Sequence, residues 1–139
     1  MGKKPLWENQ SPDQMVNFAK EWLFELENPG ESEEYGRAVV WMGFTAPLDQ
    51  QMEFLRASLA CAETDSQLLH IAAGPAEQTL SKFGVECIEE CERWAKSDSR
   101  FARMLTGVFQ HLMSDEVWGR VQSIQAGVSD PLVIEDGPA

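Results

Sequence analysis

The strongest constraint on the fold lies at the dipeptide Gly74-Pro75, which interrupts an apolar run in the middle of the chain. Glycine readily adopts the left-handed conformation that closes a helix. Proline suits the first position of a helix, because it lacks an N–H donor and already has a helical φ. We therefore predict that one helix ends at Gly74 in a left-handed conformation and that another begins at Pro75. The small residues Ala72 and Ala73 allow two helices to approach closely at this corner.

Helix starts recur along the rest of the chain, each followed by apolar residues at helical spacing. Ser11 with Gln14, and Thr64 with Gln67, have the spacing of a capping box, in which each side chain bonds the backbone N–H of the other. The predicted helices run from residue 12 to the turn at 28–30, then over 35–44, 48–62, 65–73, 75–83 and 85–96, then from a cap at 97 or 98 through 112, and from a cap at 114 to a stop at 127.

This pattern predicts an all-α protein. With 139 residues and 43% hydrophobic residues, the chain suits a single compact domain of seven or eight short helices. We expect an irregular bundle or a short solenoid-like stack, since no clean repeat period is present. Residues 1–10 are predicted to form a flexible arm, residues 11–127 the helical domain, and residues 128–139 a mostly extended tail.

The net charge limits the classes of partner. Eleven Lys and Arg residues against 23 Asp and Glu residues give a formal charge of −12. Such a charge disfavours binding to nucleic acid or to an anionic membrane, and it favours a basic partner. Acidic residues also keep many cytosolic proteins soluble, so the net charge alone does not establish a partner.

The sequence also bears on the compartment. No run approaches the roughly 18 apolar residues that span a bilayer, and the basic start at residues 1–4 is not followed by an apolar signal core. Cys61, Cys87 and Cys91 are odd in number and lie within apolar helical patterns, as expected for reduced thiols. We therefore expect a cytoplasmic protein.

The most one-sided charge lies between Glu21 and Glu34, where six acids occur without a base. Trp41 belongs to the crowded apolar helix that follows, and tryptophan is enriched among the anchors of protein interfaces. We expect this acidic surface, with Trp41, to bind a basic protein. The candidate contact residues are Glu25, Glu27, Glu31, Glu33, Glu34 and Trp41.

Candidates for catalysis or metal binding are weak. Cys87 and Cys91 are four residues apart on a predicted helix, but they are in phase with apolar neighbours and form no CxxC knuckle. His70 lies one turn before Gly74, where an imidazole commonly donates to a free carbonyl at a helix end. The sequence contains no glycine-rich phosphate loop, nucleophile elbow or helical HExxH. We therefore predict no catalytic residue, no metal site and no cofactor.

The segments around the corner form a pattern: Leu69-His70-Ile71-Ala72-Ala73-Gly74-Pro75-x-Glu77-x-x-Leu80, then Phe83-Gly84, Leu105-x-Gly107-Val108-Phe109 and Met113-x-x-x-Val117-Trp118-x-Arg120-Val121. This pattern resembles a family of small bacterial all-α domains of unknown function, over roughly residues 48–124. Ala76 departs from it, since a larger apolar residue is expected there. Some members of that family are encoded beside bacterial toxins, so the resemblance implies an immunity role.

Two functions follow as hypotheses. The first is a protein-binding module, and most specifically an immunity protein that neutralises a cognate toxin through its acidic surface. The alternative is a small enzyme or ligand-binding domain with a pocket near His70.

Overall fold

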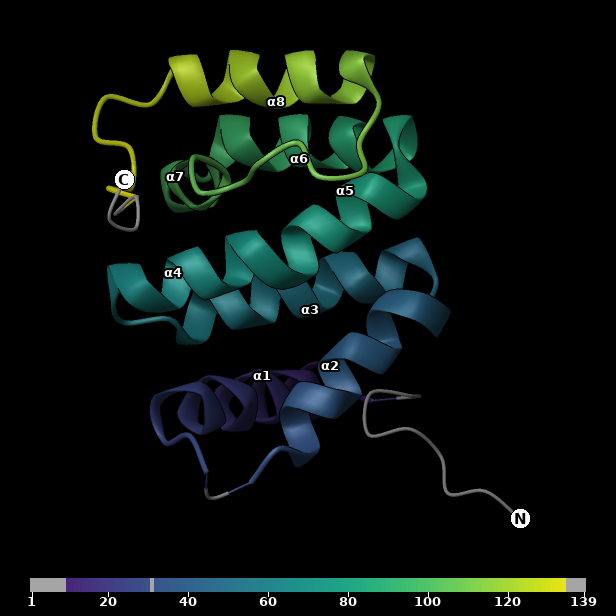
Figure 1. Ribbon diagram of the computed structural model, residues 1–139, viewed down its shortest axis with the longest axis vertical. Helices are drawn as coiled ribbons and strands as arrows, with labels where there is room; N and C mark the ends of the chain where they lie inside the picture. The colour runs from purple at the N-terminus through teal and green to yellow at the C-terminus, as the bar shows by residue number, and fades with distance from the viewer. Residues whose placement is uncertain (1–9, 31, 135–139) are drawn as a thin grey trace. The chain divides into compact units, whose positions relative to one another are not determined.

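The computed structural model describes residues 10–30 and 32–134, and in these residues it contains α-helices, one π-helical turn and no strand (Figure 1). The predicted all-α class is therefore confirmed. No helix in these ranges is both long and apolar enough to cross a membrane. The predicted flexible arm falls almost wholly on residues 1–9, outside the described residues. The elements are α1 (Pro12–Glu27), α2 (Glu34–Thr45), α3 (Leu48–Cys61), α4 (Asp65–Ile71), η1 (Ala72–Ala76), α5 (Glu77–Phe83), α6 (Val85–Ser97), α7 (Ser99–Leu105) and α8 (Asp115–Ala126).

The predicted caps begin the helices. Ser11 Oγ accepts the backbone N–H of Gln14 at 3.2 Å, and the Gln14 side chain accepts the N–H of Ser11 at 2.8 Å. Thr64 and Gln67 form the same reciprocal pair at the start of α4. Each box satisfies two N–H groups that the first turn of a helix leaves without partners. Local sequence therefore sets these two helix starts.

Two compact units divide the chain, Met1–Glu63 and Thr64–Ala139. In the first unit, α1 packs against α2 and α3. Its core is aromatic, because the ring of Phe54 lies 5.4 Å from the rings of both Phe18 and Trp22, measured between centroids. All three side chains are buried. This core fixes the face of α1 that points inward, and it leaves the other face to solvent.

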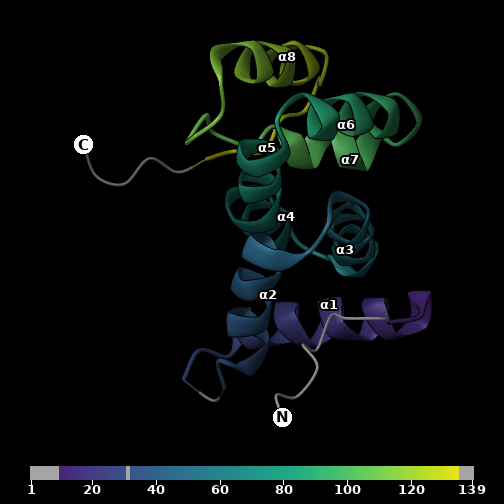
Figure 2. The same ribbon diagram turned by 90° about the vertical axis from the view of Figure 1, so that its right-hand side faces the viewer.

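In the second unit, α5 packs on α6, and α6 packs on both α7 and α8. Figures 1 and 2 show α4 and α5 following one another as one continuous rod. The core of this unit is aliphatic and sulfur-rich. Its fully buried side chains include Ile71, Leu80, Cys87, Ile88, Phe101, Met104, Leu105, Val117 and Val121.

The corner at Gly74 differs from the prediction. The backbone passes from α4 to α5 through the π-helical turn η1, and the described glycines with positive φ are Gly30 and Gly84, so a left-handed Gly74 is wrong. Pro75 provides no N–H to the helix, but the wider turn lets the N–H of Glu77 reach the carbonyl of Ala72. A π-turn thus absorbs the proline without ending the rod.

A close approach does occur at Ala72, although the neighbour is the turn after α7 and not a second helix. A Cβ added to Gly107 would lie 3.0 Å from the Ala72 Cβ and 3.0 Å from Leu69 Cδ2. The same turn ends α7 at Leu105, so the prediction of a helix through residue 112 is wrong. The N–H groups of residues 106–108 bond carbonyls three residues back, which tightens and closes the helix.

Candidate functional site

Helix α2 exposes three large apolar side chains on one face. Val40, Trp41 and Phe44 are 54%, 58% and 64% exposed. Spacings of three and four residues place them on the same side of the helix. The opposite face is inward, where Val39 and Met42 are buried. α2 is therefore apolar on both sides, and we call the group Val40, Trp41 and Phe44 the α2 stripe.

The predicted acidic contact residues lie around the N-terminal end of α2, with different surroundings. Glu33 and Glu34 are exposed at the start of α2, and Glu27 is exposed at the end of α1. Glu33 forms an ion pair with Arg37 at 3.0 Å, and both side chains are largely in solvent. Glu31 lies outside the described residues. The structure therefore places Trp41, Glu33 and Glu34 on the same helix, with Glu27 on α1.

Glu25 has a role that sequence reasoning missed. Its Oε2 accepts the N–H of Tyr35 at 2.9 Å, and its Oε1 accepts the N–H of Gly36 at 2.8 Å. Its Oε2 also accepts the hydroxyl of Ser32 at 3.3 Å. The N-cap residue Glu33 makes no side-chain cap bond, and the carboxylate of Glu25, from α1, caps α2 in its place. No short sequence motif signals a cap from ten residues away.

Gly36 completes this junction. A Cβ at position 36 would lie 3.2 Å from Glu25 Oε1, which is tighter than ordinary contact. Tyr35 is held beside it, with its ring 5.9 Å from that of Phe18. Burial, together with the negative charges of Glu21, Glu34 and Glu25, raises the pKa of the Tyr35 hydroxyl. Three carboxylates therefore lie near Tyr35 at the N-terminal end of α2.

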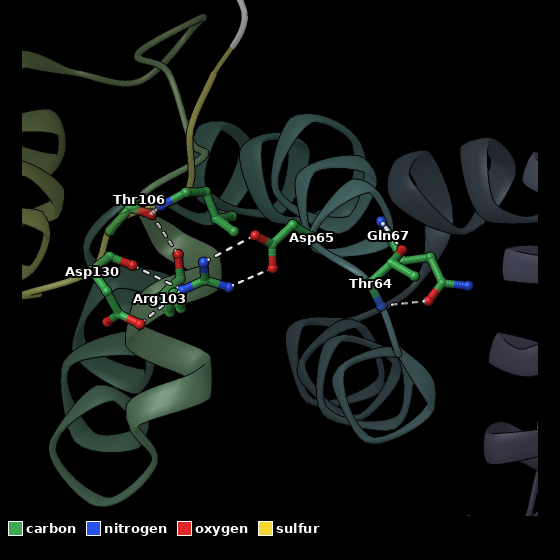
Figure 3. Close-up of polar contacts among 7 residues, drawn as sticks. Thr64, Asp65, Gln67, Arg103, Thr106 and Asp130 are labelled. Carbon is green, nitrogen blue, oxygen red and sulfur yellow. Dashed lines mark hydrogen bonds and ion pairs between the residues drawn. The ribbon is translucent and has the colours of Figure 1, made fainter.

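A second polar cluster surrounds Arg103 in the other unit (Figure 3). Its Nη1 and Nη2 donate to the two oxygens of Asp65 at 2.6 and 3.0 Å. Its Nε donates to the carbonyl of Asp130 at 2.8 Å. These hydrogen bonds hold the pKa of the Asp65 carboxyl below its ordinary value. Arg103 thus joins α4, α7 and the segment after α8.

Thr106 extends this connection. Its hydroxyl donates to the carbonyl of Arg103 at 2.6 Å and accepts the N–H of Leu132 at 2.8 Å. Leu132 is buried, so residues 130–132 are held both by polar bonds and by an apolar side chain. All of these bonds are made within the chain. The cluster is therefore a structural clamp and not an open site.

Two segments of the pattern around the corner meet in the second unit. Glu77 Oε2 accepts the N–H of Phe109 at 3.3 Å, next to the approach of Gly107 to Ala72. Burial raises the pKa of Glu77, while the bond from Phe109 and the charge of His111 oppose this shift. His111 has a φ of 47°, which is uncommon for a residue with a side chain. Packing at a helix corner accounts for this meeting without any ligand.

A cavity of about 480 Å³ lies among α6, α7 and α8. Its polar wall consists of Lys96, Ser123 and the ion pair between Arg120 and Glu92, in which Arg120 Nε donates to Glu92 Oε2 at 2.9 Å. Small or aliphatic residues form most of the remaining wall. His70 is not among the lining residues, since it is exposed on the last turn of α4. This cavity is therefore at a different place from the pocket predicted near His70.

Two of the three cysteines lie in the protein core, and the third, Cys61, is half-buried at the end of α3. Cys87 and Cys91 are buried, with their sulfur atoms 4.0 Å apart. Hydrogen bonding to Cys91 and burial raise the pKa of the Cys87 thiol, which keeps it protonated. Among residues 10–30 and 32–134, no group of three or more His, Cys, Asp or Glu side chains is arranged to hold a metal ion.

A comparison with protein-family models gives one match, to a family described as "Family of unknown function (DUF6869)", over residues 25–129. The matched region begins at Glu25, the residue that caps α2, and continues beyond α8. No curated protein and no solved structure matches the chain.

Proposed function

The chain belongs to the DUF6869 family of unknown function, and we propose that it is a protein-binding module whose contact surface is centred on α2. The observation that carries this proposal is the α2 stripe, in which large apolar side chains lie exposed on a helix whose N-terminal end carries acidic residues. Contiguous exposed apolar residues with a polar surround are typical of interaction sites. Scattered exposed apolar residues are ordinary, whereas these three lie together on one helix face.

Trp41 supplies the anchor. Tryptophan, tyrosine and arginine are enriched among the residues that carry most of the binding energy of an interface. The indole of Trp41 combines a large apolar surface with a single N–H donor. A partner that covers it removes apolar area from water at about 25 cal/mol per Å². Burial of Trp41 is therefore expected to slow dissociation.

The acidic residues specify a basic partner. Residues 21–34 carry six acids and no base, and the whole chain has a charge of −12. Such a field attracts a basic protein over a distance of roughly 10 Å at moderate ionic strength, and it raises the association rate. The carboxylates of Glu21, Glu34 and Glu25 all lie near Tyr35, which places part of this negative charge at the start of α2.

The most specific form of the proposal is an immunity protein that binds a bacterial toxin and blocks its active site. A basic toxin, such as a nuclease, has the charge that this surface would capture fastest. The resemblance to domains encoded beside toxins motivates the same choice. We also propose that the protein acts in the cytoplasm, where its three free cysteines would remain reduced.

Site-specific photocrosslinking in the native host tests the module. A photoreactive phenylalanine analogue at position 41 should form an adduct with a basic protein, whereas the same group at Gln122, exposed on α8, should not. Identification of the adduct by mass spectrometry names the partner. The proposal fails if position 41 yields no adduct, or if both positions capture the same proteins.

Co-expression then tests the immunity role. Expression of the captured partner alone should arrest growth of a heterologous bacterium, and wild-type chain should restore it. Trp41→Ser should restore growth poorly, because it removes the anchor without removing charge. A harmless partner would refute the immunity role and leave the protein-binding role in place.

A ligand-binding function has one observation in its favour, the cavity among α6, α7 and α8. Its volume of about 480 Å³ lies in the range of roughly 300–1,000 Å³ typical of small-molecule sites. Native mass spectrometry of protein purified from its host would test it. A retained small molecule supports this alternative, and an unmodified chain mass in every preparation contradicts it.

A further inference from the structure

The distribution of charge along α2 indicates what kind of segment covers the stripe. We propose that the partner contributes an amphipathic helix that runs antiparallel to α2, with apolar residues against Trp41 and Phe44 and with lysine or arginine in its last turn beside Glu34. This inference rests on the proposed function and adds the structure and the direction of the contact.

The spacing of the exposed positions favours a helix as the occupant. The charged residues Glu34 and Arg37 are followed by the stripe at three- and four-residue intervals, so all of them lie along one side of α2. From residue 34 to residue 44 this side rises about 15 Å, at about 1.5 Å per residue. A straight row of this kind is the ridge that a second helix packs against.

The row has one charged end and one apolar end. Glu33 and Glu34 lie at its N-terminal end, and no charged residue occurs from position 38 to position 48. Glu33 shares its charge with Arg37. Glu34 is exposed, and no other side chain in the described part of the chain forms an ion pair with it. Glu34 is therefore the acid at this end that is most available to a partner's cation.

The positive end of the α2 dipole does not cancel this charge. A helix N-terminus carries the equivalent of about half a positive charge. Glu25 already binds the first N–H groups of α2, and Glu33 and Glu34 add two further carboxylates. Tyr35, at this end of α2, also lies close enough to Glu21, Glu34 and Glu25 for their charges to add to the effect of burial in raising its pKa.

The direction of the partner helix follows from its own dipole. Basic side chains are stabilised in the last turn of a helix and destabilised in the first. They must lie beside the N-terminal end of α2 to reach Glu34. Both conditions hold when the partner's C-terminal end lies at the N-terminal end of α2, which is the antiparallel arrangement.

Two synthetic peptides of identical composition test this inference on the full-length chain. Both are about 18 residues long, acetylated and amidated, with leucines at heptad spacing; one carries three lysines at its C-terminal end and the other carries them at its N-terminal end. Fluorescence anisotropy at low salt should give a dissociation constant about tenfold lower for the first peptide, a difference of about 1.4 kcal/mol. Trp41→Ser should weaken both.

Charge variants separate this preference from the intrinsic helicity of the peptides. The double variant Glu33→Gln, Glu34→Gln should reduce the preference to less than about threefold, or 0.65 kcal/mol, because it removes the acidic end of the row. The control Glu86→Gln, Glu89→Gln removes the same charge from exposed positions on α6 and should leave the preference unchanged.

Equal affinities for the two peptides, or a preference that survives in the double variant, would overturn the antiparallel helix. So would the absence of binding by either peptide. If crosslinking at position 41 still captures a basic protein in that case, the proposed function stands and only the helical occupant is wrong.

Discussion

Replacing Glu25 with Gln tests whether this residue holds α2 in place as a helix cap or only contributes charge to the acidic surface. The carboxylate accepts two backbone N–H groups of α2, at 2.9 and 2.8 Å. A glutamine retains one oxygen and turns an NH₂ group toward the second N–H, so one of these bonds is lost. Hydrogen bonds to charged groups contribute about 1.5–3 kcal/mol, and loss of a helix cap costs about 0.5–2 kcal/mol. We expect the free energy of unfolding to fall by about 1–3 kcal/mol.

Urea unfolding followed by circular dichroism measures this change at constant pH. The matched control is Glu27→Gln, which removes the same charge from an exposed position near the end of the same helix. Surface substitutions of this kind change stability by less than about 0.5 kcal/mol. If the two variants unfold at the same urea concentration, Glu25 does not cap α2 and the account of its role is refuted. In the Glu25→Gln variant, Ser32 Oγ still accepts the N–H of Glu34, so the start of α2 does not lose every side-chain acceptor.

Two further predictions concern the second unit. Gly107→Val should lower the free energy of unfolding by about 1–3 kcal/mol, because its Cβ would be forced against Ala72 and Leu69. The control Gly74→Ala adds a Cβ in open space and should stay within about 0.5 kcal/mol of wild type in the same urea assay. Equal effects of the two substitutions would contradict the close approach at Gly107. Asp65 has a lowered pKa in the folded state, so it contributes stability above its unfolded pKa of about 3.9 and loses that contribution as the pH falls through its folded pKa. The stability difference between wild type and Asp65→Asn should therefore shrink as pH falls from about 5 toward 3, and a difference that is constant with pH would show that the ion pair with Arg103 does not form.

Helix starts were predictable because they depend on residues that are close in sequence. Ser11 and Gln14 are three residues apart, and no tertiary contact is needed to form their reciprocal bonds. The same holds for Thr64 and Gln67. The β-branched run at Val39-Val40 left a strand possible there, but the recurrence of such helix starts on either side favours an all-α architecture. Local rules therefore recover the fold class and most helix positions.

The corner was not predictable, because local chemistry permits two outcomes there. Gly74-Pro75 can end a helix or lie within a π-turn, and both remove the need for the missing N–H. Contacts outside the dipeptide accompany the second outcome. Thr79 Oγ donates to the carbonyl of Pro75 at 2.6 Å. Gly107, which is more than 30 residues away in sequence, approaches Ala72 closely. The apolar periodicity likewise predicted a helix over residues 106–112, where the chain instead turns at Gly107 against Ala72.

The surface of α2 shows the same limit. Val39, Val40, Trp41 and Met42 are four consecutive apolar residues, so they cover more than half of the helix circumference and do not reveal which face is inward. The packing of α2 on α1 resolves this, and the cap from Glu25 fixes that packing. Exposure of Trp41 is thus a tertiary property, although its position in a crowded apolar helix was visible in the sequence.

The six acids between Glu21 and Glu34 therefore do not form a uniform surface. A carboxylate that already binds backbone N–H groups, as Glu25 does, cannot turn toward a partner without uncapping α2. Glu33 shares its charge with Arg37, whereas Glu27 and Glu34 are exposed. Substitution of Glu25 should thus disturb a partner complex by displacing the α2 stripe, and substitution of Glu34 should act through charge alone. Only the effect of the Glu34 substitution should diminish as salt is added, because salt screens exposed charges. The effect of the Glu25 substitution should persist, because salt does not restore the position of α2.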